Sequence, residues 1–439
     1  MNMNYGITKN FVDDLRKFTQ YQFDIYNIEP SFPKDIANLK ESDFKVEKCS
    51  YRKEFLEEKV LTIDAMDCKD MDDAVSLMKT SLGYRLAVHV ADVASYVPLG
   101  SKLDRLASYR ATSIYLPHLT VPMLPNVLFN NCCSLKAGVL RNTLSVIMYI
   151  NKKGDLVSSK ITKGLIKSKV KGVYSEVNKL LSGVKDEVLI KKYKDVYKDI
   201  FEMSRLYQIL RSKRIARGSN TEDANKPKIV VSNNDIVLIP KKEGIAENMI
   251  EEFMILANNV VAEYLYNNNL PAIYRTHEKK KHLALYNPIK LHHEDLALES
   301  YSHFTSPIRR ISDLKIHQVL TMHLNGYGKK KIDELFTGVL DEICYMATKR
   351  IRTVKQVVDK CEKYCYKQYF LINWKNKYTG KVVAFDYLRR PIIEISKYNI
   401  KILGDDIRVG KINEWYSFNV DVSKDSNKLL TINSRRIRF

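Results

Sequence analysis

The feature that most constrains this chain is an acidic stretch held between two short apolar runs. Aspartates crowd residues 64–73, after Val60-Leu61-Thr62-Ile63 and before Ala74-Val75-Ser76-Leu77. A disordered acidic tail would be polar throughout, so the apolar flanks indicate a strand leading in, partly buried carboxylates, and a strand leading out. Buried like charges destabilise one another, and such a cluster persists only where protonation or a cation offsets the repulsion. The aspartates are Asp64, Asp67, Asp70, Asp72 and Asp73.

The ligand chemistry of these carboxylates favours a hard cation. An all-oxygen set suits Mg²⁺ or Mn²⁺ better than zinc. The stretch is not an EF-hand, because it lacks the glycine and the distal bidentate glutamate of that loop. A solvated acidic surface loop, or a weak Ca²⁺ site, accounts for the same residues. The residues of the stretch alone leave these interpretations open.

The charge of the whole chain favours a polyanionic partner. The 439 residues include 72 Lys plus Arg against 51 Asp plus Glu, a net charge of +21. Such an excess indicates nucleic acid before membrane. Lysine-rich surface charge that serves only solubility gives the same balance. The length is enough for two or three domains with a large core.

The cysteines and the apolar runs bear on the compartment. The seven cysteines form no CxxC pair and are odd in number, which argues against a zinc ribbon and a disulfide framework. No stretch approaches the apolar run needed to span a bilayer. The first 30 residues carry four acidic side chains, which a leader peptide would avoid. We therefore predict a cytoplasmic protein with no membrane partner.

The hydropathy pattern divides the chain into three parts. Residues 1–50 are predicted to form a short N-terminal arm, too small for an ordinary domain. The pattern is mainly strands over 51–165, helical and basic over 173–217, and helical again up to about 372. Short strands separated by polar turns over 376–439 predict a small β-barrel. An RNA-binding barrel of the OB type is the natural candidate, and a structural cap that binds nothing is the alternative.

The clearest helix is predicted over 247–266. At 100° per residue, Glu251 shares one flank with Asn258, and Glu252 shares the other with Asn259. Polar groups therefore line both sides of a buried stripe, which is also what ordinary amphipathic decoration looks like. The apolar residues that define the stripe are Ile250, Phe253, Met254, Ala257 and Val261.

A second helix is predicted to start at Thr305-Ser306-Pro307. Ser306 would be the N-cap and Pro307 the first helical residue. Arg309 and Arg310 then fall in the first turn, where cations oppose the helix dipole. The conflict disappears if the arginines and the free amides face an anion such as a backbone phosphate. A pair of arginines lying on a surface helix is the alternative.

Eight short segments of the chain match segments of a known protein family and follow one another in the same order. They lie at 62–74, 89–97, 103–105, 113–117, 121–125, 133–135, 250–254 and 301–310. Through these segments the chain resembles the ribonuclease II/R (RNB) family of 3′→5′ exoribonucleases over roughly residues 51–325. The order of so many segments is far more specific than any one of them. It favours a metal site over a solvated loop in the acidic stretch.

The resemblance implies a fold and an activity. It implies an α/β (α+β) catalytic domain of the RNB type over 51–372, followed by an OB/S1-like barrel over 376–439. Such an enzyme hydrolyses single-stranded RNA processively from its 3′ end and releases 5′-mononucleotides with Mg²⁺ or Mn²⁺. Two divalent ions held by shared carboxylates can activate a water and stabilise the departing oxygen.

The resemblance also implies roles for individual residues. The metal-binding and catalytic aspartates correspond to Asp64, Asp70, Asp72 and Asp73, while Asp67 has no counterpart in the family. Further positions correspond to RNA contacts: Tyr115 stacks on the 3′-terminal base, Glu251 or Glu252 and Glu299 accept a ribose hydroxyl, and Arg309 with Arg310 contacts phosphates.

The chain departs from the family pattern in two places. The family usually carries two cold-shock domains before the catalytic one, and the first 50 residues are too few for them. We therefore expect weaker substrate capture, or an accessory RNA-binding protein in their place. The segment 276–299 is shorter than usual, and lysines at 279–281 stand roughly where the family has an arginine, which loses bidentate phosphate geometry.

Two other functional classes stay open on the sequence. One is a non-catalytic RNA-binding subunit that retains the fold, and the other is a nuclease that prefers single-stranded DNA. The complete aspartate set favours the exoribonuclease. The readouts that separate the three are a metal requirement and a response to 2′-deoxy substitution at the 3′ end.

Overall fold

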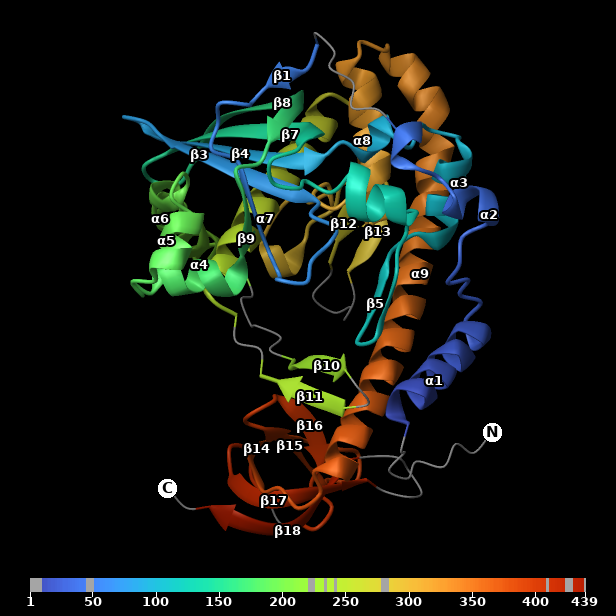
Figure 1. Ribbon diagram of the computed structural model, residues 1–439, viewed down its shortest axis with the longest axis vertical. Coiled ribbons are helices and arrows are strands. Elements are labelled where there is room, and N and C mark those ends of the chain that lie inside the picture. The colour runs from blue at the N-terminus through green and yellow to red at the C-terminus, as the bar shows by residue number, and fades with distance from the viewer. Residues whose placement is uncertain are drawn as a thin grey trace.

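A seven-stranded mixed sheet forms the centre of the larger part of the molecule (Figure 1). The computed structural model describes residues 10–44, 51–219, 226–232, 235–240, 243–277, 284–407, 410–422 and 429–437. The strand order is β1-β8-β7-β4-β3-β2-β9, with parallel pairing in β1–β8 and β2–β9 and antiparallel pairing elsewhere. The strands are β1 (Lys53–Glu54), β2 (Leu61–Asp64), β3 (Asp73–Lys79), β4 (Gly83–Ala91), β7 (Leu140–Asn151), β8 (Leu156–Lys167) and β9 (Val170–Val173).

The middle of this sheet is buried on both faces. Every residue of β4 is buried, and its sequence is mostly apolar on both faces, with Arg85 and His89 as the exceptions. The register pairs Leu61 with Val75 and Asp73 with Val90. The acidic stretch is therefore the connection between two neighbouring antiparallel strands. The predicted α/β fold class is confirmed.

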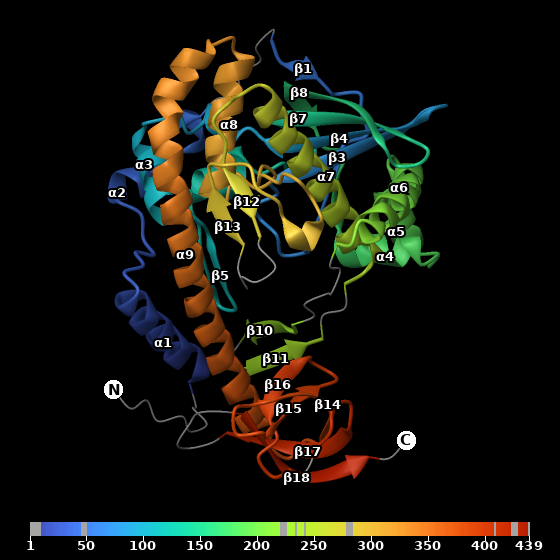
Figure 2. The ribbon, with the colours of Figure 1, turned by 180° about the vertical axis from the view of Figure 1, so that it is seen from behind.

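Helices pack against the sheet. Helix α6 contacts β3, and helix α7 contacts β2, β4 and β7 (Figure 2). The helix predicted over 247–266 is confirmed as α7, Ile245–Asn267. The last helix, α9, has 44 residues and is about 66 Å long at 1.5 Å per residue. Within the described ranges, no helix combines the length and apolar character that crossing a bilayer requires. The main helices are α4 (Tyr174–Leu181), α5 (Glu187–Lys192), α6 (Tyr197–Ala216), α7, α8 (Ile311–Leu324) and α9 (Lys329–Ile372).

The N-terminal arm is fixed to the rest of the chain. Helix α1 (Phe11–Ile25) lies along α9 in both views, and Phe18 stacks on Tyr364 with 4.8 Å between ring centroids. The short helix α2 (Lys34–Ala37) and the turn η1 (Glu41–Asp43) follow α1. The buried Arg110, at the end of α3 (Lys102–Arg110), donates to the backbone carbonyls of residues 29 and 30 at 2.8 and 2.9 Å.

A closed five-stranded barrel follows α9. Its order β14-β15-β16-β18-β17, with β16 and β18 parallel at Leu403 and Leu430, is that of an OB-type barrel, as predicted. The hairpin β10–β11 lies between the barrel and the sheet, and its apolar side belongs to the core of the barrel (Figures 1 and 2). These strands are β10 (Lys228–Ser232), β11 (Asp235–Ile239), β14 (Tyr378–Phe385), β15 (Pro391–Ile395), β16 (Ile400–Leu403), β17 (Trp415–Val422) and β18 (Leu429–Ile437).

The helix start predicted at Ser306 and Pro307 is wrong. Helix α8 begins at Ile311, with Arg310 as its N-cap. Residues 306–310 instead form a turn whose Ser306 carbonyl accepts from the amides of Arg309 and Arg310 at 3.3 and 3.0 Å. Arg310 also pairs with Thr112 in an isolated antiparallel bridge. Tertiary contacts, rather than local capping, decide where this helix starts.

We expect Arg110→Ala to loosen the N-terminal arm. The change removes the charged hydrogen bonds from the buried Arg110 to backbone carbonyls of the arm and should lower the free energy of unfolding by about 2–3 kcal/mol. The measurement is the urea midpoint together with limited proteolysis between residues 26 and 44. The exposed Arg105→Ala on the same helix is the matched control, and equal behaviour of the two variants would contradict the prediction.

Candidate active site

The acidic stretch lies where β2 ends and β3 begins. Asp64 is the last residue of β2 and Asp73 is the first of β3, so the antiparallel register brings the two together. Asp72 is 3% exposed, and Asp64, Asp70 and Asp73 are half-buried. The loop between them is held by Lys171 of β9, which donates to the carbonyls of Met66 and Cys68 at 3.3 and 2.8 Å.

Crowding changes the acidity of these carboxyls. Burial raises the pKa of Asp64, and the charges of Asp72 and Asp70 raise it further. Burial and the charge of Asp64 likewise raise the pKa of Asp73. Burial raises the pKa of Asp72 well above its usual range, although Arg309 and the amide of Ile308 act in the opposite direction. Without a counter-ion, part of the cluster therefore holds protons near neutral pH.

Groups from a distant part of the chain donate to the carboxylate of Asp72. The amide of Ile308 donates to Asp72 Oδ1 at 2.8 Å, and Arg309 Nε lies 3.2 Å from Asp72 Oδ2. Arg309 Nη2 also donates to Ser306 Oγ at 2.8 Å. The turn that replaces the predicted helix start thus supplies donors to the most buried aspartate.

Tyr115 joins the cluster from the hairpin β5–β6 (Ile114–Leu116 and Leu119–Val121). Its hydroxyl donates to Asp70 Oδ2, while the residue as a whole is 43% exposed. The neighbouring Ile114 and Leu116 pack in a core shared with α1 and α9, which holds the hairpin in place. The ring therefore stands at the edge of the acidic cluster with one face towards solvent.

The donor set suits a hard divalent cation. Asp64 Oδ2 is buried and has no hydrogen-bond partner among the described residues, as expected of an oxygen that awaits a ligand. As the side chains stand, no three His, Cys, Asp or Glu groups of the described chain converge on one point. Of the four aspartates, Asp70 faces Tyr115 and Asp72 faces Arg309. Cation binding would require these two carboxylates to turn towards Asp64 and Asp73.

The structure distinguishes between the two neighbouring glutamates. Glu252 is 3% exposed and is held by Arg214, with Nη2 to Oε1 at 2.6 Å and Nε to Oε1 at 2.8 Å. Its proposed RNA contact would have to break a buried ion pair, so the structure speaks against that role. Glu251 is 47% exposed and lies 3.8 Å from the same guanidinium. Of the two, Glu251 can reach a ligand without that cost.

The other predicted RNA contacts differ in accessibility. Glu299 is 86% exposed and stands 3.4 Å from His292. Arg310 is half-buried and donates to Asp313 Oδ1 at 2.7 Å, so the phosphate contact predicted for it would have to replace this ion pair. The lysines at 279–281 lie outside the described residues. The RNA contacts of Tyr115, Glu251, Glu299 and Arg309 stay predictions.

Two residues that the sequence analysis missed organise the segment before α8. Asn258 donates to the hydroxyl of Tyr301 at 2.9 Å and accepts from the amide of Phe304 at 2.9 Å. Asp313 accepts from the amide of Ser306 at 2.8 Å as well as from Arg310. The only sequence signal for Asn258 was its place on the flank of α7, and Asp313 gave none.

Comparison with known families assigns the chain to one of them. Residues 52–285 and 282–326 match the profile of the RNB domain, so the chain belongs to the RNB domain family. The resemblance inferred from the ordered segments is thereby confirmed.

Among its relatives, ribonuclease R of Thermotoga maritima is 35% identical over 364 residues, which are 70% of this chain and 51% of the relative. The chain spans about half the length of the curated relatives it matches. The structure of Mycoplasma genitalium RNase R in complex with ribose methylated single-stranded RNA has a TM-score of 0.78 and 23% identity, over 98% of this chain and 75% of that chain. Yeast Ssd1, a pseudonuclease, has a TM-score of 0.67 and 15% identity, over 94% and 58% of the two chains. These structural likenesses show the fold alone.

We expect Mn²⁺ binding at pH 7 to release protons. The pKa values of Asp64, Asp72 and Asp73 are raised, so a cation must displace protons from them and its apparent affinity should rise with pH. Calorimetric titration in two buffers of different ionisation enthalpy measures the protons released. Asp64→Asn should reduce both the release and the affinity.

The control for this titration is Asp67→Asn. The carboxylate of Asp67 is 68% exposed and paired with Lys228 at 2.8 Å, and that hydrogen bond lowers its pKa. Its loss should leave the proton release unchanged. Binding of Mn²⁺ with no proton release at pH 7 would contradict the assignment of the raised pKa values.

Proposed function

We propose that this chain is a 3′→5′ exoribonuclease that removes mononucleotides from single-stranded RNA with two divalent cations, Mg²⁺ or Mn²⁺. The observation that carries the proposal is the aspartate cluster of a chain of the RNB domain family, in which Asp64 Oδ2 has no hydrogen-bond partner among the described residues. Asp64, Asp70, Asp72 and Asp73 would hold the cations, which activate a water and offset charge on the leaving oxygen when bound.

Arg309 is placed to act on the phosphate. Its guanidinium is half-buried and touches Asp72, so it is oriented by a carboxylate while part of it remains accessible. When Asp72 turns to hold a cation, a phosphodiester beside the cluster would take its place as the partner of Arg309. A cation held next to the reacting phosphate offsets the charge that develops there.

Tyr115 and Glu251 are placed to hold the terminal nucleotide. The Tyr115 ring can stack on any base, a grip that tolerates sequence. The accessible carboxylate of Glu251 can accept a hydrogen bond from a ribose hydroxyl, which DNA lacks at the 2′ position. The net charge of +21 favours association with the RNA backbone over its length.

A non-catalytic RNA-binding protein is the second candidate. The chain shares its fold with a pseudonuclease, and the carboxylates as placed do not converge on one point in the described residues. The fold is therefore compatible with binding alone. Only a measurement of the chemistry separates the two candidates.

The decisive test is a 5′-labelled single-stranded RNA incubated with the protein in Mg²⁺. We expect a ladder that shortens from the 3′ end, lost in EDTA and slowed at least about 100-fold by Asp72→Asn, which removes a charge at the centre of the cluster. Asp67→Asn, in the same loop but exposed, should keep nearly the activity of the parent protein. RNA that is bound but stays intact would establish the RNA-binding candidate instead.

We expect Glu251→Gln to weaken the preference for RNA. The carboxylate contributes a charge-assisted hydrogen bond worth about 1.5–3 kcal/mol, so discrimination against a 2′-deoxy 3′ end should fall by about 10- to 100-fold. The measurement compares initial rates on the two substrates for parent and variant. An unchanged ratio would remove Glu251 from the ribose contact.

The matched control is Glu252→Gln. It should leave the ratio of rates unchanged and instead lower the thermal stability, because it strips the buried Arg214 of its counter-charge. Opposite results for the two variants would exchange their roles.

A further inference from the structure

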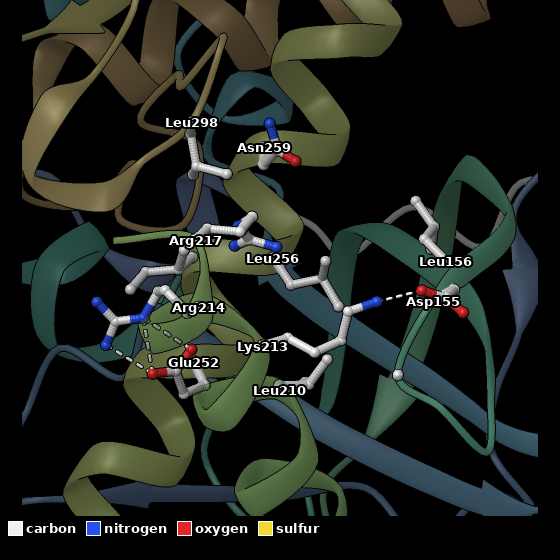
Figure 3. A pocket seen from close by; sticks show the side chains of 12 residues that line it. Asp155, Leu156, Leu210, Lys213, Arg214, Arg217, Glu252, Leu256, Asn259 and Leu298 are labelled. Carbon is white, nitrogen blue, oxygen red and sulfur yellow. Dashed lines mark hydrogen bonds and ion pairs between the residues drawn. The ribbon is translucent and has the colours of Figure 1, made fainter. Parts of the chain in front are cut away.

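A cavity lies apart from the aspartate cluster, on the flank of α7 that carries Glu252 and Asn259. It has a volume of about 340 Å³ and is enclosed by the C-terminal half of α6, by α7 and by the β7–β8 turn (Figure 3). Neither the acidic stretch nor Tyr115 or Arg309 contributes to its lining. Glu252 and Asn259, the flank of α7 that the proposed reaction leaves unused, do contribute to it.

Among the charged residues that line this cavity and that the structure describes, one cationic side chain has no ion-pair partner. Glu252 is taken by Arg214, and Lys213 is bound to Asp155 across the opening (Figure 3). Arg217 is exposed at the rim and has no ion-pair partner among the described residues. The rim is therefore a place where an anionic group gains a counter-charge.

Aliphatic side chains form part of the cavity wall, and Asn259 adds an acceptor to it. Leucines and an isoleucine line the space beside the charged rim. Asn259 donates its amide to the carbonyl of Ser300 at 2.8 Å, and its own Oδ1 has no partner in the described part of the chain. The apolar lining residues are Leu156, Leu210, Ile255, Leu256 and Leu298.

We propose that this cavity binds a nucleoside 5′-monophosphate at a site distinct from the aspartate cluster. The phosphate would lie against Arg217, the base between the leucines, and an exocyclic amine of the base would donate to Asn259. The volume is at the lower end of the range of small-molecule sites, which suits a mononucleotide rather than a longer ligand. The choice of nucleotide rests on the proposed function, because 5′-mononucleotides are the compounds that such an enzyme releases.

Equilibrium dialysis of radiolabelled AMP against the full chain in EDTA tests the proposal. Arg217→Glu reverses the charge at the rim, and Leu156→Trp fills the opening at an exposed position, so neither should disturb folding. Each should weaken AMP binding at least about tenfold. Lys198→Glu, the same charge reversal at the other end of α6, and Asp72→Asn should leave it unchanged.

Unlabelled competitors identify the parts of the ligand that are recognised. AMP should displace the label at lower concentration than adenosine or inorganic phosphate. Phosphate that competes as well as AMP would reduce the site to an anion site and overturn the nucleotide assignment. AMP binding that survives both cavity variants, that is lost in Asp72→Asn alone, or that is absent altogether would overturn the proposal.

The RNA degradation assay on the same preparations separates this inference from the proposed function. Protein that shortens RNA but does not bind AMP through Arg217 refutes the cavity site and leaves the exonuclease standing. Protein that binds AMP through Arg217 but leaves RNA intact refutes the exonuclease and leaves the cavity site standing.

Discussion

The burial of like charges where β2 meets β3 is the constraint on which the surrounding structure depends. An uncompensated buried carboxylate costs several kcal/mol, whereas a helix N-cap contributes about 1 kcal/mol. The turn at 306–310 therefore gives up the cap that Ser306 could form and brings the Ile308 amide and Arg309 to Asp72. Buried pairs further out fix the elements that carry these donors. Lys315 of α8, for example, binds Asp104 of α3 at 2.7 Å.

This difference in energies explains which elements could be predicted from the sequence and which could not. The acidic connection between two strands, helix α7 and the terminal barrel have local signatures: an apolar run, a 3.6-residue stripe and short alternating strands. The start of α8 also had a local signature, at Ser306 and Pro307, but the prediction from it was wrong. The amide of Ile308 is instead bound to Asp72, a residue 236 positions away in the chain. Local capping rules have no access to such a partner.

The same limit applies within the candidate site. The family resemblance predicted a contact between the terminal nucleotide and either Glu251 or Glu252 but could not choose between these two residues, which point to different flanks of the helix. The choice is made by Arg214 on α6, whose ion pair with Glu252 joins residues 38 apart. Arg214 also lies within 3.8 Å of Glu251. One guanidinium therefore contacts a carboxylate on each of the two polar flanks of α7.

The acidic loop is also connected to the barrel, by an ion pair whose free energy can be compared with that of the contacts to the sheet. Asp67 binds Lys228 of β10, whose hairpin packs into the core of the barrel, but both side chains are more than half exposed. An exposed ion pair contributes at most about 1 kcal/mol. Lys171 reaches the same loop from the neighbouring strand of the sheet, through two backbone carbonyls at 2.8 and 3.3 Å. The loop is thus positioned by the sheet rather than by the barrel. Loss of the ion pair between Lys228 and Asp67 would therefore leave Asp64, Asp70, Asp72 and Asp73 in place.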